Sequence, residues 1–280
     1  MKRKLLLLVS SFFVALGLVF WRTHILGTYV ENFNGFFFNE YNLIRAMYAI
    51  VLIAIVVFVC IAVFTDKQFP GSSRRSSKTL GLLNLAYCVV LFINAMTLSK
   101  FAEEAYDYVY ILLIFALFCY MIYYAVCLFT FKKVNALIST IPLIVFVLKL
   151  ADYFIESFGV VKTSEITINI VALSFCVIFF LYYARYVAKL HFRKVRKNTV
   201  AAGVLAYMFC LIAVVPDMIA PLFYAKVESR LEVTETLFML ATATYIMGFL
   251  VISLCKPALY AHRHKKEEYV SDPYYANEEE

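Results

Sequence analysis

Glycine and proline, which most often interrupt regular secondary structure, are scarce in this sequence, with 8 Gly and 6 Pro among 280 residues. Charged residues are also few, at 16%, whereas hydrophobic residues make up 64%. A soluble domain of ordinary composition has roughly 45–50% apolar residues, and a chain of this length could not bury so much apolar surface in one core. The composition therefore excludes an ordinary soluble domain and indicates an integral membrane protein.

The motifs of the common enzyme classes are missing as well. The chain has no HExxH, GxSxG, Walker or GxGD sequence, and its 7 cysteines form no CxxC pair. All the cysteines fall in apolar runs, so we expect small buried hydrophobes rather than disulfides or metal ligands. His262 and His264 belong to a polar tail and are expected to be solvated. The sequence therefore predicts no catalytic residue, no cofactor and no metal site.

Apolar runs of about 20 residues, the length of a helix that crosses a bilayer, recur along the chain. We predict an all-α polytopic bundle over residues 1–260, without a soluble domain, and a disordered polar tail over residues 261–280. The eight predicted spans are about residues 5–21, 42–64, 79–99, 108–131, 134–157, 166–188, 199–224 and 236–255. The first run resembles a secretory signal, with small residues Ala15 and Gly17, but it continues apolar through Trp21 and favours an uncleaved span.

Basic residues are divided unequally between alternate loops. One set of loops carries 18 of them: Lys2, Arg3, Lys4, Lys67, Arg74, Arg75, Lys78, Lys132, Lys133, Lys189, Arg193, Lys194, Arg196, Lys197, Lys256, Arg263, Lys265 and Lys266. The other set carries 5: Arg22, Lys100, Lys162, Lys226 and Arg230. By the positive-inside rule, we predict that both termini are cytoplasmic and that the protein lies in the plasma membrane.

The same rule explains the net charge of +7 without nucleic acid as a partner. The lipid bilayer is the first predicted partner. The basic inner loops are candidates for contact with anionic lipid, or with a membrane or cytoplasmic protein.

Three charged residues interrupt the fifth apolar run, in the stretch VLKLADYFIES. Lys149, Asp152 and Glu156 are spaced so that they share one helical face. A lone charge at mid-span costs about 2.5–3.5 kcal/mol, so Lys149 requires a partner. Asp217 of the seventh run lies at a similar predicted depth. We therefore predict an ion pair between Lys149 and Asp217, with Asp152 as the alternative partner.

Two prolines flank Asp217. Pro216 has no N–H for the carbonyl of Ile212, and Pro221 has none for the carbonyl of Asp217. Together with Pro142, these prolines are the candidate helix kinks. Further polar residues are predicted in the same leaflet, and the candidates for ligand binding or ion pairing are Lys149, Asp152, Asp217, Arg45, Asn94 and Asn169.

These polar residues have two interpretations. In the first, they form an outward-opening pocket that binds or transports a small molecule or ion. In the second, they form hydrogen bonds and one ion pair that hold the helices together. The stretches AVVPDMIAPLF and YYARYVAKLHFRK, with short basic inner loops, resemble uncharacterised polytopic membrane proteins of Gram-positive anaerobic bacteria. That resemblance implies no activity. Three classes stay open: a binding or transport protein, a non-catalytic sensor or assembly subunit, and a lipid-directed intramembrane enzyme that uses Asp152 and Asp217.

Overall fold

A computed structural model gives the fold of the protein. It describes residues 2–29, 48–49, 52–53, 55–57, 78–101, 105–130, 132, 134–159, 164–188, 195–224 and 233–261. All regular secondary structure within these residues is helical, which confirms the predicted all-α class. Within the same residues, 7 helices are long and apolar enough to cross a membrane. The protein is therefore a multi-pass integral membrane protein.

The helices begin and end near the predicted positions, although several extend beyond them. They are α1 (Lys2–Tyr29), α3 (Lys78–Phe101), α4 (Ala105–Thr130), α5 (Ile141–Gly159), α6 (Ser164–Val187), α7 (Val195–Phe223) and α8 (Val233–Ala261). Of the predicted second span, residues 48–49, 52–53 and 55–57 are described and are helical, and the rest lies outside the described residues. The predicted tail also lies outside them, apart from Ala261.

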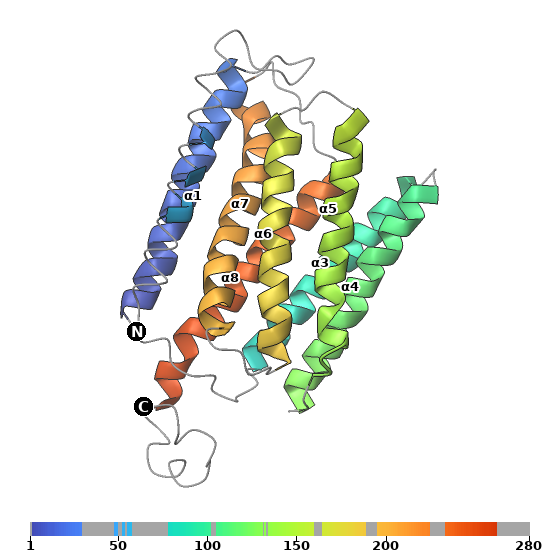
Figure 1. The fold of residues 1–280 in the computed structure, drawn as a ribbon, viewed down its shortest axis with the longest axis vertical. Helices are drawn as coiled ribbons and strands as arrows, with labels where there is room; N and C mark the ends of the chain where they lie inside the picture. The colour runs from blue at the N-terminus through green and yellow to red at the C-terminus, as the bar shows by residue number, and fades with distance from the viewer. Residues whose placement is uncertain are drawn as a thin grey trace.

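Helices α3 to α8 run in alternating directions (Figure 1). The start of α1 and the end of α8 lie at the same end of the bundle. Helix α7 is the central element, because it packs against α1, α6 and α8. Of its most apolar 18 residues, 89% are buried, against 33–56% in the other spans. Polar groups on α7 are therefore removed from lipid and must find partners inside the protein.

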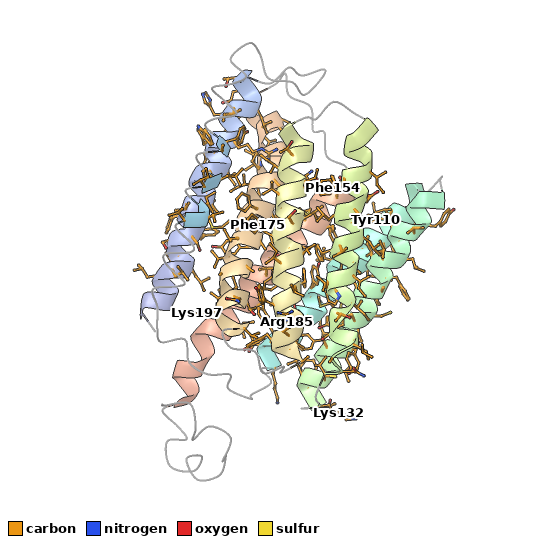
Figure 2. All side chains as sticks on the ribbon, in the orientation of Figure 1. Tyr110, Lys132, Phe154, Phe175, Arg185 and Lys197 are labelled. Carbon is orange, nitrogen blue, oxygen red and sulfur yellow. The ribbon has the colours of Figure 1, made fainter. Side chains whose placement is uncertain are left out.

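Side chains fill the spaces between the helices (Figure 2). Lys132 and Lys197, which belong to two of the predicted cytoplasmic basic segments, lie in the lower half of the bundle, toward the start of α1 (Figure 2). These two lysines therefore lie toward the end of the bundle at which α1 begins.

Helix α5 begins later than predicted, at Ile141, so that Pro142 is its second residue. The backbone N–H of Leu137 donates to the Oδ1 atom of Asn135, 3.0 Å away, in a turn that precedes the short 3-10 helix η1 (Ile138–Thr140). Pro142 follows in the first turn of α5, where the missing proline N–H costs little. Pro142 therefore lies at the start of a helix rather than inside a longer one.

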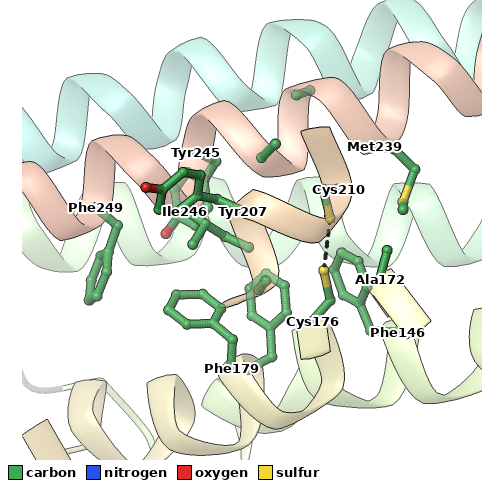
Figure 3. Packing of buried hydrophobic residues seen from close by; sticks show 14 of the residues in the cluster. Phe146, Ala172, Cys176, Phe179, Tyr207, Cys210, Met239, Tyr245, Ile246 and Phe249 are labelled. Atoms are coloured by element: carbon green, nitrogen blue, oxygen red, sulfur yellow. Dashed lines mark hydrogen bonds between the residues drawn. The ribbon is translucent and has the colours of Figure 1, made fainter. Parts of the chain in front are cut away.

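Aromatic rings and small residues make up the interior between α5, α6, α7 and α8 (Figure 3). The rings of Phe146 and Phe180 stack with centroids 4.5 Å apart. A Cβ atom added at Gly203 would lie 3.0 Å from both Phe179 and Leu250, so glycine permits this close packing.

Five cysteines, Cys88, Cys119, Cys127, Cys176 and Cys210, are free thiols. Cys176 and Cys210 are buried, with their Sγ atoms 3.3 Å apart (Figure 3), and Cys88 and Cys127 are buried too. The expectation that every cysteine is buried is wrong for Cys119, which is exposed on α4. An apolar run on an outer helix has a lipid-facing side, and Cys119 lies there.

Candidate functional site

Arg22 does not lie in an outer loop, where the sequence predicts it. It lies inside α1, which continues to Tyr29. Its side chain is fully buried, with 0% exposure. A buried guanidinium keeps its charge and requires hydrogen-bond acceptors, so its contacts define the first charged centre of the bundle.

The Arg22 guanidinium contacts α7 at the point where Pro216 interrupts the helical hydrogen bonds. Its Nη1 group donates to the carbonyl oxygens of Ile212 and Ala213, the latter at 2.9 Å. Pro216 has no N–H, so the Ile212 carbonyl lacks its usual helical donor. Arg22 supplies a substitute donor from a neighbouring helix, which satisfies a backbone group that lipid could not.

Asp217 completes this first centre. Its Oδ2 atom lies 3.6 Å from Nη2 of Arg22, and the Asp217 side chain is only 6% exposed. This distance defines an ion pair and is longer than a hydrogen bond. We call Arg22, Asp217 and the Ile212 carbonyl the arginine centre.

A small cavity of about 30 Å³ adjoins the arginine centre. It lies between α1, the described residues of the second span, α6 and α7, and its lining residues are Leu18, Trp21, Arg22, Tyr48, Leu52, Ile55, Ile168, Val171, Phe209 and Ile212. Arg22 is the only charged residue in this lining. The surface that the cavity presents is apolar, and the Arg22 guanidinium is buried beside it.

A second charged centre surrounds Lys149 on α5. The Lys149 side chain is 2% exposed, and its Nζ group donates to the hydroxyl of Tyr110 on α4. The same Nζ atom lies 4.1 Å from the Tyr110 ring centroid and 4.6 Å from that of Phe238 on α8. Both rings present a negative face to the ammonium group. Glu235 on α8 provides the counter-charge, with Oε1 at 3.6 Å.

The predicted pair between Lys149 and Asp217 is wrong, because each residue pairs with a different partner. Asp217 pairs with Arg22 and Lys149 with Glu235. Arg22 and Glu235 fall one residue outside the predicted spans 5–21 and 236–255, whereas α1 and α8 extend to include them. The underlying argument, that a charge inside the membrane requires a partner, holds for both centres.

The other predicted site residues are distributed around these centres. Asp152 is half-buried on α5. Asn94 is buried on α3 and donates from Nδ2 to the backbone carbonyl of Thr234, 2.7 Å away. Asn169 is buried on α6, and its Oδ1 atom has no hydrogen-bond partner in the part of the chain that the structure describes. Arg45 lies outside the described residues.

A third polar cluster, composed mainly of tyrosines, was not anticipated. The hydroxyls of Tyr183 on α6 and Tyr245 on α8 lie 2.8 Å apart, and Tyr245 also donates to Oδ1 of Asn84 on α3 at 3.1 Å. Tyr87 stacks on the Tyr245 ring at 4.8 Å and bonds through its hydroxyl to Thr242 at 2.9 Å. Asn84 in an otherwise apolar run, together with Thr242 and Tyr245 in the eighth run, is the sequence signal for this cluster.

No protein-family model, curated protein sequence or solved structure matches this chain. The fold and its polar centres therefore define the protein only as a multi-pass helical membrane protein. Among the described residues, one fully buried ion pair, Arg22–Asp217, and one partly buried pair, Lys149–Glu235, join helices of the bundle. In the described residues, no group of three or more His, Cys, Asp or Glu side chains could hold a metal ion.

Proposed function

We propose that the protein binds or transports a small ion or molecule through the outer half of its helical bundle. The observation that supports this most is the buried Arg22–Asp217 ion pair, which lies beside a cavity on the central helix. Ionisable residues inside a membrane are costly and commonly mark ion or substrate pathways. The proposal keeps the outward-facing site predicted from the sequence and moves its centre from Lys149 to Arg22.

The interruption of α7 supports the same assignment. Both Pro216 and Pro221 lie inside this helix, so two of its carbonyls lack helical donors. In membrane proteins, such irregular backbone is tolerated where it is buried in protein or lines a cavity. Arg22 donates to the Ile212 carbonyl that Pro216 leaves free. A bound ligand could compete with this carbonyl for the guanidinium of Arg22.

A non-catalytic sensor or assembly subunit is the second candidate. It is favoured by the contacts of Lys149, which are made to Tyr110, Phe238 and Glu235 of the chain itself. A site satisfied in this way holds helices together without any ligand. The enzyme alternative has weaker support, because Asp217 is paired with Arg22 rather than placed opposite Asp152 as an acid and base.

The proposed orientation places both termini in the cytoplasm and the arginine centre toward the outer side of the plasma membrane. It is supported by the position of Lys132 and Lys197 in the half of the bundle where α1 begins (Figure 2). The His24 ring, 3.0 Å from the Tyr224 hydroxyl, lies with the ends of α1 and α7 in the opposite half (Figure 1).

Reconstitution into liposomes tests the proposed function. We expect one of a panel of small cations and anions to produce flux or charge movement, and Asp217→Asn to reduce it at least tenfold. Lys100→Gln, which changes an exposed residue at the end of α3, is the matched control and should retain the flux. A silent protein that instead copurifies with a defined membrane partner, in an Asp217-independent manner, would favour the subunit.

A further inference from the structure

One end of the bundle carries basic residues from several helices. Lys132 follows the end of α4, Arg185 lies in the last turn of α6, and Lys197 lies in the first turn of α7. All three lie in the lower half of the bundle (Figure 2). Lys132 is exposed, and Arg185 and Lys197 are half-buried. We call these three side chains the basic end, because they bring positive charge from three segments of the chain to one region of the molecule.

The stretches of sequence that supply the basic end contain no acidic residue. Residues 108–151 and 166–216, which include all three cations, have neither Asp nor Glu. Asp217 and Glu235 lie toward the other end of the bundle, near the end of α7 and the start of α8. These stretches therefore give the basic end a net positive charge.

The charge of Lys197 does not stabilise the helix to which it belongs. The start of a helix carries a partial positive charge, so a cation is unfavourable there. Helix α7 has no acidic residue in its first turn to offset this effect. Arg185, at the end of α6, has the favourable position for a cation. The position of Lys197 therefore favours a source of negative charge outside α7.

Tyrosine side chains mark the basic end as the level of the lipid headgroups. Tyr182 and Tyr186 lie close to Arg185 along α6, and the Arg185 guanidinium carbon lies 5.9 Å from the Tyr182 ring centroid. On α4, the hydroxyl of Tyr123 accepts a hydrogen bond from the backbone N–H of Asn135 at 3.2 Å. Tyrosine is enriched at the membrane–water interface, where Lys and Arg extend their charged groups toward the headgroups. The anion that a bilayer offers at this level is the phosphate of a phospholipid.

We propose that the basic end binds the headgroups of anionic phospholipids, with Arg185, Lys197 and Lys132 as the cations that attract the phosphate. The sequence predicts such contact for the basic inner loops in general, and the inference narrows it to the ends of α4 and α6 and the start of α7. A guanidinium pairs with two phosphate oxygens at once, and an ammonium group adds a point charge. The inference goes beyond the proposed function, because binding a lipid requires no transport.

Native mass spectrometry of the purified full chain in mild detergent tests the proposal. We expect phosphatidylglycerol to bind saturably and more tightly than phosphatidylcholine, and we expect this preference to weaken as the salt concentration rises. Equal binding of the two lipids would overturn the proposal. Glycerol phosphate, the soluble form of the same headgroup chemistry, should not displace phosphatidylglycerol at equal concentration. Displacement by glycerol phosphate would indicate a site for a soluble phosphate and would also overturn the lipid assignment.

Variants of the basic end make the test specific. Arg185→Gln/Lys197→Gln should weaken the binding of phosphatidylglycerol by about thirtyfold, since each basic residue near the membrane surface contributes a factor of about five. The charge-preserving variant Arg185→Lys/Lys197→Arg and the control Lys100→Gln, at the other end of α3, should retain the binding. Unchanged binding in the first variant, or an equal loss in Lys100→Gln, would overturn the proposal. If the first variant does not fold, Lys132→Gln, outside the helices, replaces it with an expected loss of about fivefold.

The liposome assay separates this inference from the proposed function. Selective binding of phosphatidylglycerol by a protein that shows no flux supports the lipid site and counts against transport. Flux that depends on Asp217, together with equal binding of the two lipids, supports transport and overturns the lipid site.

Discussion

At the residue scale, the buried charges among the described residues follow one rule: each of them lies near an opposite charge from another helix. Arg22 of α1 meets Asp217 of α7, and Lys149 of α5 meets Glu235 of α8. The two pairs differ in burial, because Asp217 is 6% exposed and Glu235 is 26% exposed. This difference leads to two predictions.

The first concerns the fully buried pair. We expect Arg22→Gln and Asp217→Asn each to lower the free energy of unfolding by about 3–5 kcal/mol, because either change leaves a buried charge without a counter-ion. The double variant should lose less than the sum of the two single variants. Thermal unfolding in mild detergent measures the three values, with Lys100→Gln as the exposed control. Strictly additive losses would show that Arg22 and Asp217 do not interact.

The second prediction concerns the pair at Lys149. Glu235 retains contact with the surroundings, so it can be hydrated after its partner is removed, whereas Lys149 at 2% exposure cannot. We therefore expect Glu235→Gln to lower the melting temperature more than Lys149→Met. The reverse order of these two variants would contradict the assigned contact.

Tyr110→Phe should lower the free energy of unfolding by about 1 kcal/mol. It removes the hydrogen bond from Lys149 but keeps the aromatic ring beside the ammonium group.

At the element scale, α1 and α7 are joined by more than apolar packing. The hydroxyls of Ser11 and Tyr207 are hydrogen-bonded, and His24 lies 3.0 Å from the hydroxyl of Tyr224. The Cβ of any larger residue at Gly27 would lie 2.4 Å from the Tyr224 ring. Between these contacts, Arg22 donates to the Ile212 carbonyl that Pro216 leaves free. Helix α1 is thus bonded to α7 along its length.

The link between Arg22 and Pro216 gives a third prediction. Pro216→Ala restores a backbone N–H, which can bond to the Ile212 carbonyl within α7. The cost of Arg22→Gln should therefore fall by about 1 kcal/mol in the Pro216→Ala background. Pro221→Ala is the matched control, because the carbonyl it would satisfy belongs to Asp217, whereas Arg22 donates to the carbonyls of Ile212 and Ala213. Equal rescue by both proline variants, measured by thermal unfolding, would contradict the mechanism.

At the scale of the whole molecule, the positions of the helices agree with a chain that starts and ends on one side of the membrane. The start of α1 and the end of α8 lie together, while α1 ends and α3 begins at opposite ends (Figure 1). The unequal basic loops predict that the side with both termini is cytoplasmic.

The fourth prediction follows from this topology. A reporter that is active only in the cytoplasm should work when fused after Lys266 and should fail when inserted between Lys226 and Glu235. A reporter fused after Lys132, between α4 and α5, should also be active, because this segment is predicted to be cytoplasmic as well. An inactive fusion after Lys266 together with an active insertion before Glu235 would invert the proposed orientation.

The all-α class and the approximate position of seven described helices were predictable from the sequence, because apolar content and the length of a bilayer span depend only on local composition. The need of Lys149 and Asp217 for partners was predictable too, since the cost of a buried charge does not depend on the fold. Depth along a helix follows from a rise of about 1.5 Å per residue, so the similar depth of the two charges is a prediction that needs only the sequence.

Tertiary structure alone decided which residues meet. Lys149 and Asp217 lie at similar predicted depths, yet the facing of each helix and the order of its neighbours assign Asp217 to Arg22 and Lys149 to Glu235. The tyrosine cluster of Tyr183 and Tyr245 depends on the same facing. Composition and spacing determine how far a side chain lies along its own helix, whereas the direction it points in relation to other helices depends on packing across the whole bundle.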